Sequence, residues 1–402
     1  MSLLEVKDLH TSFRTDDGIV RAVEGVSFEV EKGQTLGIVG ESGSGKSVTC
    51  LTIMGLNPSR NTISTGEALW KGKNLLTAKP RELREIRGSE ISMIFQDPMT
   101  SLNPVHTIGR QLIEAIQLHR DLTKRAAHAR ARELLKAVGI PKADARMDDY
   151  PHQFSGGMRQ RVMIAMALIN DPDLLIADEP TTALDVTTQA QILTLMKRLQ
   201  EEFGSAVLII THDLGVVAET ADDVLVMYAA KVVEQASVDD LFNRPQHPYT
   251  WGLMGSLPRL EADLERLTQI PGQPPSLLRP PAGCRFHPRC PHVMEVCKTT
   301  EPPLAPSERD PAHLQACHLD QETKDREAAK LIQTEDLPEA VAESAPQMTE
   351  GLQTSVSETK RQLIVSTWRE CEGDHNRTAA RLNVHPNSLR RLIRVLGLRE
   401  ML

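Results

Sequence analysis

One stretch decides the fold of this chain: Gly40-Glu41-Ser42-Gly43-Ser44-Gly45-Lys46-Ser47, with the spacing G-x-x-x-x-G-K-S. The apolar run 36–39 before it predicts a buried strand, and the proline-free run from residue 46 to about residue 56 predicts a helix. The glycines let successive backbone N–H groups turn inward around phosphate oxygens, and the helix directs the positive end of its dipole at them. A chance glycine-rich turn is the alternative, but the strand and the helix favour a nucleotide-binding loop. In such a loop, Lys46 reaches the β and γ phosphates and Ser47 binds Mg²⁺.

Three later apolar runs end in polar side chains. Gln96 ends the first, Asp178 and Glu179 end the second, and His212 follows the third. Because the ends of parallel strands meet at one edge of a sheet, we expect these side chains near the phosphate-binding loop. Gln96 is then expected to reach the metal or a water, and Asp178 to hold Mg²⁺ indirectly. Glu179 would polarise the attacking water and His212 would contact the γ-phosphate, although a lone histidine is more often structural.

A second glycine-rich segment, Ser155-Gly156-Gly157-Met158, comes directly before a helix predicted at 161–169. A serine and two glycines at the N-terminus of a helix form an anion-binding site, because their backbone N–H groups have no partner within the helix. The sequence therefore predicts two segments that bind phosphate.

The remaining segments of this part of the chain predict supporting structure. Residues 1–35 alternate short apolar runs with turn signals, which indicates antiparallel strands. Phe13 lies on this stretch, where its ring either stacks on an adenine or belongs to the core. Residues 108–138 are highly charged with apolar side chains at helical spacing, which predicts an inserted helical subdomain.

Length, charge and hydropathy limit the class of protein. The 402 residues suffice for two or more domains, and the net charge of −8 argues against nucleic-acid binding by the whole protein. No apolar run approaches the roughly 18 residues that cross a bilayer, and the first residues are acidic too early for a signal peptide. We therefore expect a cytosolic protein.

The order of these motifs resembles the ATPase subunits of ABC transporters, and residues 1 to about 320 resemble the oligopeptide, dipeptide and nickel importer branch. The matching motifs are Walker A at 40–47, the Q-loop Gln96, the signature at 154–158, the Walker B end at Asp178-Glu179, the D-loop Ala183-Leu184-Asp185 and the switch His212. Segments 96–104, 150–153 and 247–250 are typical of the importer branch. Departures are small: Phe154 and Met158 replace the leucine and glutamine of the commonest signature, and Ala230 stands where many relatives carry glycine.

The resemblance implies an α/β P-loop ATPase core at 1–240, with an antiparallel β subdomain and a helical subdomain at about 97–170. It also implies ATP and Mg²⁺ as ligands, with the nucleotide closed in by the signature segment and Asp185 of a second ATPase subunit. That partner is usually a non-identical paralogue, and a homodimer is the alternative. Two permease subunits and, indirectly, an extracytoplasmic solute-binding protein complete such importers, which places this chain at the cytoplasmic face of the cell membrane. The cargo would be a peptide, a related small solute or nickel.

Residues 241–320, called the extension below, are rich in proline and hold four of the six cysteines: Cys284, Cys290, Cys297 and Cys317. In a reducing compartment such clustering favours metal binding over disulfides. The gaps are not the C-x₂-C pattern of zinc ribbons or simple ferredoxins. Three interpretations fit these cysteines: a 4Fe-4S cluster, a zinc ion or unliganded thiols. The resemblance supports the first, because in some importer relatives the same arrangement resembles an iron–sulfur ligand set.

The last segments differ in composition from the rest. Residues 321–357 read as a linker, with helix predicted near 326–333. Residues 358–402 have helix-turn-helix spacing similar to Fis-type DNA-binding domains, with eight arginines and four acids between 361 and 402. The side chains expected in the DNA groove are Asn387, Ser388, Arg390, Arg391 and Arg394, while a helical module for protein contacts is the alternative.

Two other functional classes compete with an importer ATPase. Soluble ABC ATPases of translation or DNA repair share the core, but the translation members usually carry two cores in one chain and this sequence has one. A DNA-binding regulator that keeps an ATPase domain as a sensor is supported only by the tail.

Overall fold

The computed structural model describes residues 2–58, 60–97, 101–182, 184–256 and 270–332, together with residues 365, 367–369, 371, 377, 378 and 381. The chain divides into two compact units, Met1–Thr334 and Glu335–Leu402. The first unit contains every named element. Residues 321–332, expected to belong to a linker, form a helix within it.

The main sheet has eight strands in the order β11-β12-β10-β9-β3-β8-β7-β6. Its strands are β3 (Thr35–Val39), β6 (Ile91–Ile94), β7 (Leu174–Asp178), β8 (Ala206–Thr211), β9 (Asp223–Tyr228), β10 (Lys231–Ser237), β11 (Ala305–Pro306) and β12 (Leu314–Gln315). Strands β6, β7, β8, β3 and β9 run parallel, whereas β10 is antiparallel to β9 and β12 is antiparallel to β10. Strands β9 and β10 thus form a hairpin whose turn contains Ala229 and Ala230.

A second sheet is antiparallel, as the first 35 residues predict, with the order β2-β1-β4-β5. Its strands are β1 (Leu4–Thr15), β2 (Gly18–Val30), β4 (Thr62–Trp70) and β5 (Lys73–Asn74). Apolar side chains of this sheet pack with those of the main sheet and of helix α1 (Lys46–Ile53) into one core, which includes Leu4, Phe28, Ile38, Ile53 and Leu208. The helix that follows the phosphate-binding loop is therefore packed between two sheets.

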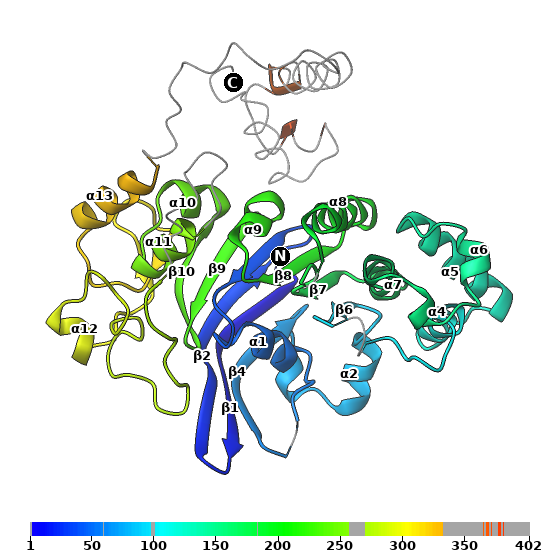
Figure 1. Cartoon of the computed structure of the whole chain (residues 1–402), viewed down its shortest axis with the longest axis horizontal. Helices are drawn as coiled ribbons and strands as arrows, with labels where there is room; N and C mark the ends of the chain where they lie inside the picture. The colour runs from blue at the N-terminus through cyan, green and yellow to red at the C-terminus, as the bar shows by residue number, and fades with distance from the viewer. Residues whose placement is uncertain are drawn as a thin grey trace. The chain divides into compact units, whose positions relative to one another are not determined.

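The helices lie in groups around the main sheet (Figure 1). The inserted group has α4 (Ile108–Gln117), α5 (Lys124–Ala137) and α6 (Ala143–Arg146), and its apolar faces share a core with α7 (Gly156–Leu168) and α8 (Val186–Phe203). On the opposite side of the sheet in this view are α10 (Val238–Asn243), α11 (Pro248–Gly255), α12 (Glu295–Thr299) and α13 (Gln321–Ile332). The remaining short elements are α2 (Pro80–Ile86), α9 (Leu214–Thr220), η1 (Leu75–Thr77) and η2 (Pro151–Gln153).

Strand register brings the chemistry to one edge of the main sheet. Val39, the last residue of β3, lies opposite Thr211 of β8, and Asp178 of β7 lies opposite Ile210. The carboxyl ends of three neighbouring parallel strands are thus level, and the residues that follow each strand gather at the same edge.

Candidate nucleotide site

The loop between β3 and α1 has a backbone that only glycine can adopt at two positions. Gly40 has φ +153°, and a Cβ there would lie 2.1 Å from the Met227 carbonyl oxygen. Gly45 has φ +105°, and its Cβ would lie 2.3 Å from the Ala22 carbonyl oxygen. Neighbouring strands therefore hold the loop so closely that no side chain fits at either position, while nothing lies within 4 Å of the Cβ position of Gly43.

The polar side chains of this loop fit a phosphate ligand. Lys46 is only 4% exposed, and its Nζ donates to the carbonyl oxygens of Gly40 at 2.7 Å and Glu41 at 3.0 Å. Burial lowers the pKa of its ammonium group, which Glu179 and other nearby carboxylates oppose. The buried hydroxyl of Ser44 has no hydrogen-bond partner among the described residues. A buried donor without a partner and a desolvated cation are both satisfied by phosphate oxygens.

Ser47 and Asp178 bring two oxygen ligands together at the same edge. The Ser47 hydroxyl donates to Asp178 Oδ1 at 2.9 Å across 131 residues of sequence. Burial raises the pKa of the Asp178 carboxyl group, and the hydrogen bond from Ser47 opposes that shift. Mg²⁺ prefers oxygen ligands of this kind, so these two residues could hold the Mg²⁺ ion that binds together with a nucleoside triphosphate.

Glu179 has a strained backbone and three polar neighbours. Its φ is +47°, in the left-handed region that a glutamate rarely occupies, and its backbone N–H donates to the Ile210 carbonyl oxygen at 2.9 Å. Its carboxylate accepts from Gln96 Nε2 at 2.9 Å and from the Thr182 hydroxyl at 2.8 Å. His212 Nδ1 lies 3.4 Å from the other carboxylate oxygen. Strain of this kind clusters at functional sites, where the surrounding structure holds the residue in place.

The other residues predicted for the nucleotide lie elsewhere. Ser155 caps the N-terminus of α7 by accepting from the Met158 N–H at 3.3 Å, and Asp185 caps α8 by accepting from the Thr188 N–H at 3.0 Å. Gly157 lies near α8, because a Cβ there would be 3.0 Å from Thr188 Cγ2. Phe13 is half-buried on β1, opposite Val20 and Thr62.

Comparison with known proteins shows which families and proteins this chain is similar to. The family model for ABC transporters matches residues 23–182, and the model for the C-terminal region of oligopeptide/dipeptide transporters matches residues 233–297. The chain is 55% identical over 317 residues to a probable peptide ABC transporter ATP-binding protein of Sinorhizobium fredii, covering 78% of this chain and 94% of the relative. This chain belongs to the family of ABC transporter ATP-binding proteins.

Other relatives of this ABC ATPase carry importer names. It is 54% identical to the oligopeptide transport ATP-binding protein OppD of Escherichia coli, over 79% of this chain and 93% of the relative. It is 56% identical to the dipeptide transport ATP-binding protein DppD of Lactococcus lactis, over 75% of this chain and 86% of the relative. Among solved structures, the ATP-binding cassette MJ0796 in a dimeric post-hydrolysis state with ADP and Pi matches with a TM-score of 0.53 and 28% identity. That match covers 58% of this chain and 98% of the cassette. The α/β P-loop ATPase fold expected from the sequence is confirmed, as is ATPase activity at the level of the family.

Two contacts of Glu41 were not predicted from the sequence. Its carboxylate pairs with Arg289 of the extension, and its backbone N–H donates to the Tyr249 hydroxyl at 2.7 Å. Burial raises the pKa of the Tyr249 hydroxyl, and the pair with Glu41 raises the pKa of the Arg289 guanidinium. The only sequence signal was the importer-branch segment 247–250, which contains Tyr249.

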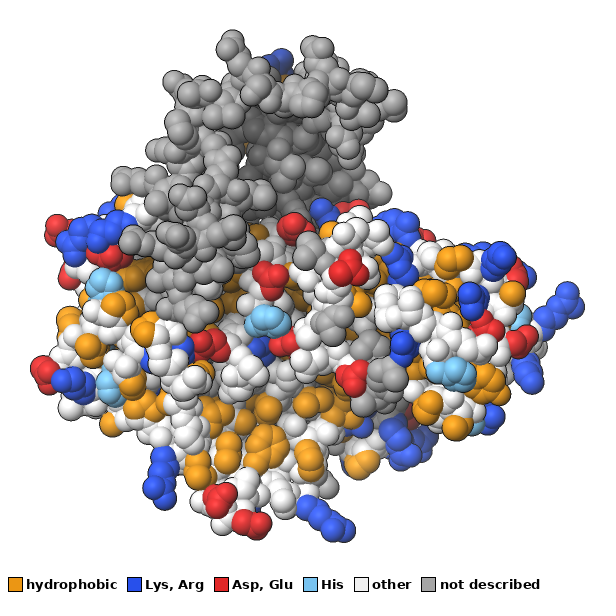
Figure 2. Space-filling view, in the orientation of Figure 1, with side chains coloured by type: hydrophobic (Ala, Val, Ile, Leu, Met, Phe, Trp, Pro, Cys, Tyr) orange, Lys and Arg blue, Asp and Glu red, His pale blue; other side chains and the backbone are white. Residues whose placement is uncertain are grey.

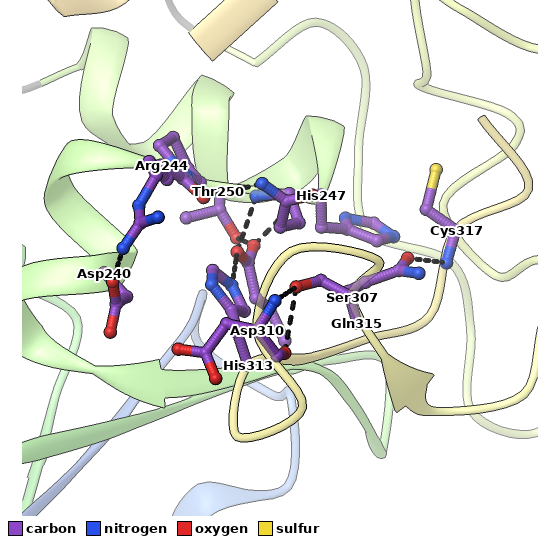
Figure 3. A network of polar contacts seen from close by, with 12 residues as sticks. Asp240, Arg244, His247, Thr250, Ser307, Asp310, His313, Gln315 and Cys317 are labelled. Carbon is purple, nitrogen blue, oxygen red and sulfur yellow. Dashed lines mark hydrogen bonds and ion pairs between the residues drawn. The ribbon is translucent and has the colours of Figure 1, made fainter. Parts of the chain in front are cut away.

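A buried carboxylate attaches the extension to the core (Figure 3). Glu234 of β10 is fully buried and accepts from the Thr250 hydroxyl of α11 at 2.5 Å. It also accepts from the backbone N–H groups of Gln246 at 2.6 Å and His247 at 3.0 Å. His313 Nε2, from the extension, lies 2.7 Å from Glu234 Oε1. Four groups from two segments of the extension thus satisfy one carboxylate, which fixes α11 and the segment around His313 against β10.

The four clustered cysteines are free thiols in this structure. The Cys284 N–H donates to the Cys297 carbonyl oxygen at 2.9 Å, and burial raises the pKa of Cys290 to about 12 and that of Cys317 to about 11. Within the described ranges, no three cysteine, histidine or acidic side chains are grouped as a metal ion requires. As they lie, the thiols do not fit the 4Fe-4S or zinc site considered from the sequence.

The proposed DNA contacts cannot be placed. Asn387, Ser388, Arg390, Arg391 and Arg394 all lie outside the residues that the structure describes. In the part of the chain that is described, no helix combines the length and the apolar character that crossing a membrane requires.

Proposed function

We propose that this ABC ATPase hydrolyses ATP to power the uptake of dipeptides or oligopeptides through a separate membrane permease. The observation that carries the proposal is the convergence of Ser47, Asp178 and Glu179 with Gln96 and His212 beside the phosphate-binding loop. The peptide cargo is supported by the names of the relatives and by the match of residues 233–297 to an oligopeptide/dipeptide transporter region.

In the proposed reaction, water attacks the γ-phosphorus and ADP leaves. Glu179 orients the water and accepts its proton, while Gln96 and Thr182 hold the carboxylate in position. His212 bridges the water and the γ-phosphate, and Lys46 stabilises the negative charge that develops on the phosphate oxygens. Mg²⁺, held by Ser47 and by Asp178 through water, would neutralise charge on the phosphates.

The second half of each site is proposed to come from another ATPase subunit. The N-terminus of α7 is formed by Ser155, Gly156 and Gly157, which are exposed or half-buried. Their backbone N–H groups are therefore accessible to a phosphate bound to a partner subunit. Met158 and Asp185 would complete that contact. A non-identical paralogue is the proposed partner and a homodimer is the alternative, and a mass measurement of the assembled transporter would distinguish the two.

The permease is proposed to dock on the inserted helices at the cytoplasmic face of the membrane. A groove of about 560 Å³ runs beside α4 and α5, and its lining includes Arg110, Ile113, Leu118 and His128. Leu118 is 72% exposed, so the groove offers apolar surface to a partner. Figure 2 shows hydrophobic and basic side chains interspersed over this part of the molecule. A mixed surface of this kind suits an amphipathic helix of the permease.

Reconstitution tests the function directly. The chain is assembled in vesicles with its candidate permeases, second ATPase subunit and solute-binding protein, and ATP hydrolysis is measured with a dipeptide, an oligopeptide or Ni²⁺. We expect a peptide to stimulate hydrolysis, and Glu179→Gln to abolish the stimulation. Stimulation by Ni²⁺ alone would assign a metal cargo, and failure to assemble with any permease would contradict an importer.

A shared metal site at the four cysteines remains a hypothesis with its own test. The backbone hydrogen bond between Cys284 and Cys297 keeps two of the cysteines close, and a bound metal would require the thiols to converge further and to lose their protons. Anaerobic purification followed by iron, sulfide and zinc analysis distinguishes a 4Fe-4S cluster, a zinc ion and free thiols. Metal-free protein with four titratable thiols in this segment would reject the hypothesis.

A further inference from the structure

Glu41, the second residue of the phosphate-binding loop, forms a two-pronged ion pair with Arg289 of the extension. Arg289 Nη1 donates to Glu41 Oε2 at 2.6 Å, and Nη2 donates to Glu41 Oε1 at 2.9 Å. The two residues are 248 positions apart in the sequence. Two parallel hydrogen bonds between a guanidinium and a carboxylate add geometric specificity to the ion pair as well as strength.

Arg289 is held rigidly from its other side. Its side chain is only 4% exposed, and it donates from Nε to the Pro271 carbonyl oxygen at 2.9 Å and from Nη2 to the Ile270 carbonyl oxygen at 3.2 Å. The guanidinium carbon lies 5.8 Å from the centre of the Tyr228 ring. This arginine is therefore a built part of the loop's surroundings rather than a mobile surface cation, and the residue that follows it is Cys290.

A second residue of the extension, Tyr249, holds the backbone of Glu41. The Tyr249 hydroxyl that accepts from the Glu41 N–H is fully buried, and the next residue, Thr250, donates to Glu234 in the network of Figure 3. The fixed position of α11 thus fixes the tyrosine beneath the loop. Both the side chain and the backbone of Glu41 are restrained from outside the ATPase core motifs.

A second arginine of the extension reaches the far end of the same loop. Arg285, which follows Cys284, pairs with Glu24 and donates from Nη1 to the Ala229 carbonyl oxygen at 2.5 Å. The neighbouring Ala230 N–H donates to the Ser44 carbonyl oxygen at 2.9 Å. The extension therefore contacts the phosphate-binding loop directly at Glu41 and, through one turn, at Ser44.

The charge of Glu41 gives this arrangement a function. A carboxylate in a loop that binds a triphosphate repels the ligand unless a cation neutralises it. For a solvent-accessible site, one unpaired charge near the phosphates weakens binding by on the order of tenfold, and salt reduces the effect. The bidentate geometry neutralises the carboxylate and turns it toward Arg289.

We propose that Arg289 is a positioning residue of the nucleotide site, through which the cysteine-bearing extension sets the affinity for MgATP. The inference rests on the proposed function, because it assigns a role to a residue that touches the loop rather than the nucleotide. Arg289 neutralises Glu41 and fixes the first turn of the loop, so its loss weakens ground-state binding without removing a group that acts on the attacking water.

The test is a double-mutant cycle on the full chain, in which the two charges are removed singly and together. MgATP affinity is measured with a fluorescent ATP analogue, at low and at physiological ionic strength, for wild type, Arg289→Met, Glu41→Gln and the double variant. We expect Arg289→Met to weaken binding by about tenfold, most at low salt, and the double variant to recover to within about threefold of wild type. Arg309→Met removes an exposed arginine of the extension that pairs with Asp325, and it should leave affinity unchanged.

Two further readouts distinguish positioning from simple structural support. In the assembled transporter, Arg289→Met should raise the KM for ATP while kcat at saturating ATP stays near wild type. Glu41→Gln leaves the extension intact and should bind no more weakly than wild type, with a steeper loss of affinity as salt rises. This variant keeps the proposal testable if Arg289→Met fails to fold.

The inference is overturned if folded Arg289→Met binds MgATP like wild type, or if Glu41→Gln does not relieve its defect. Weakened binding in Glu41→Gln alone would also overturn it. Lys46→Ala separates this outcome from failure of the proposed function. If Lys46→Ala abolishes binding while Arg289→Met does not change it, only the role of Arg289 is wrong; if Lys46→Ala binds normally, the nucleotide site itself is wrong.

Discussion

His212 Nδ1 lies 3.4 Å from a carboxylate oxygen of Glu179, although the two residues follow different strands of the main sheet. Gln96, which follows a third strand, donates to the other oxygen of the same carboxylate. Three strand ends therefore converge on one acidic group, and that group has a left-handed backbone held by the Ile210 carbonyl oxygen. The geometry makes Glu179 the residue whose removal is most informative.

We expect Glu179→Gln to keep MgATP binding and to slow hydrolysis by about 100-fold or more, because the amide cannot accept a proton from water. Single-turnover hydrolysis and a separate binding titration measure the two effects. The amide has nearly the same shape as the carboxylate, and its one oxygen can still accept from Gln96 and Thr182. Near-normal turnover in this variant would mean that another group orients the water.

Lys46→Ala should instead weaken nucleotide binding itself by about tenfold or more, because the buried ammonium is the cation inside the loop. Lys46→Arg is the matched control, since it keeps the charge but not the length. If both variants bind MgATP like wild type, the loop does not hold the phosphates as proposed.

The free energy of unfolding should fall as pH is lowered below about 6.5, because His247 takes up a proton there in the unfolded chain. Burial, followed by the charge of Lys324, lowers the pKa of His247 from 6.5 to about 3, and its Nδ1 accepts from the Tyr249 N–H at 3.0 Å. The unfolded chain binds a proton below about pH 6.5 while the folded chain does not. The free energy of unfolding should therefore fall by up to about 1.4 kcal/mol per pH unit as pH drops from 6.5 toward 3.

Denaturant titrations at several pH values measure this dependence. His247→Asn is the control, because asparagine keeps an acceptor for the first turn of α11 and carries no titratable group. The difference in slope between the two proteins isolates the contribution of His247 from that of other titrating groups. Equal slopes would show that this histidine contributes nothing.

Glu234→Ala should destabilise the first unit by about 3 kcal/mol or more, because it leaves several buried donors without an acceptor. Glu234→Gln keeps one acceptor oxygen and should cost less. Urea unfolding followed by the fluorescence of Trp251, which lies on α11, reports the change close to the site. An unchanged midpoint for Glu234→Ala would show that the network does not fix the extension.

The tail allows a separate prediction about DNA. If residues 358–402 form a helix-turn-helix, the full chain should bind duplex DNA with an affinity that falls steeply as salt rises, because arginines displace condensed counterions. An Arg390→Ala/Arg391→Ala variant should bind more weakly at every salt concentration. Binding that is undetectable at low salt, or that does not depend on these arginines, would favour the protein-contact module.

The sequence predicts the geometry of the phosphate-binding loop and of the neighbouring strand ends because its signals are local. The loop at 40–47 needs glycine where neighbouring strands approach, and Gly40 and Gly45 meet that requirement in the structure. The meeting of Gln96, Glu179 and His212 follows from the rule that parallel strands end at one edge. Each of these inferences needs only a short window and the assumption of a parallel sheet.

Other features escaped prediction because their signal is not local. The hairpin of β9 and β10 turns at Ala229 and Ala230, which have φ of +45° and +73°, so no glycine marks the turn. The pairing of Glu41 with Arg289 joins segments that share no periodic pattern. A sequence shows that both charges exist, but only the packing of the extension against the loop brings them together.

The separation of Glu41 and Arg289 also has a consequence for synthesis on the ribosome. Glu41 is made 248 residues before its cation. At about 5–20 residues per second, translation leaves about 12–50 s between the two. If Arg289 compensates Glu41 as proposed, the loop of a nascent ATPase core carries an unpaired carboxylate during that interval and should bind MgATP about tenfold more weakly. On that proposal, the chain should reach its full nucleotide affinity only after the cysteine-bearing extension has emerged and folded.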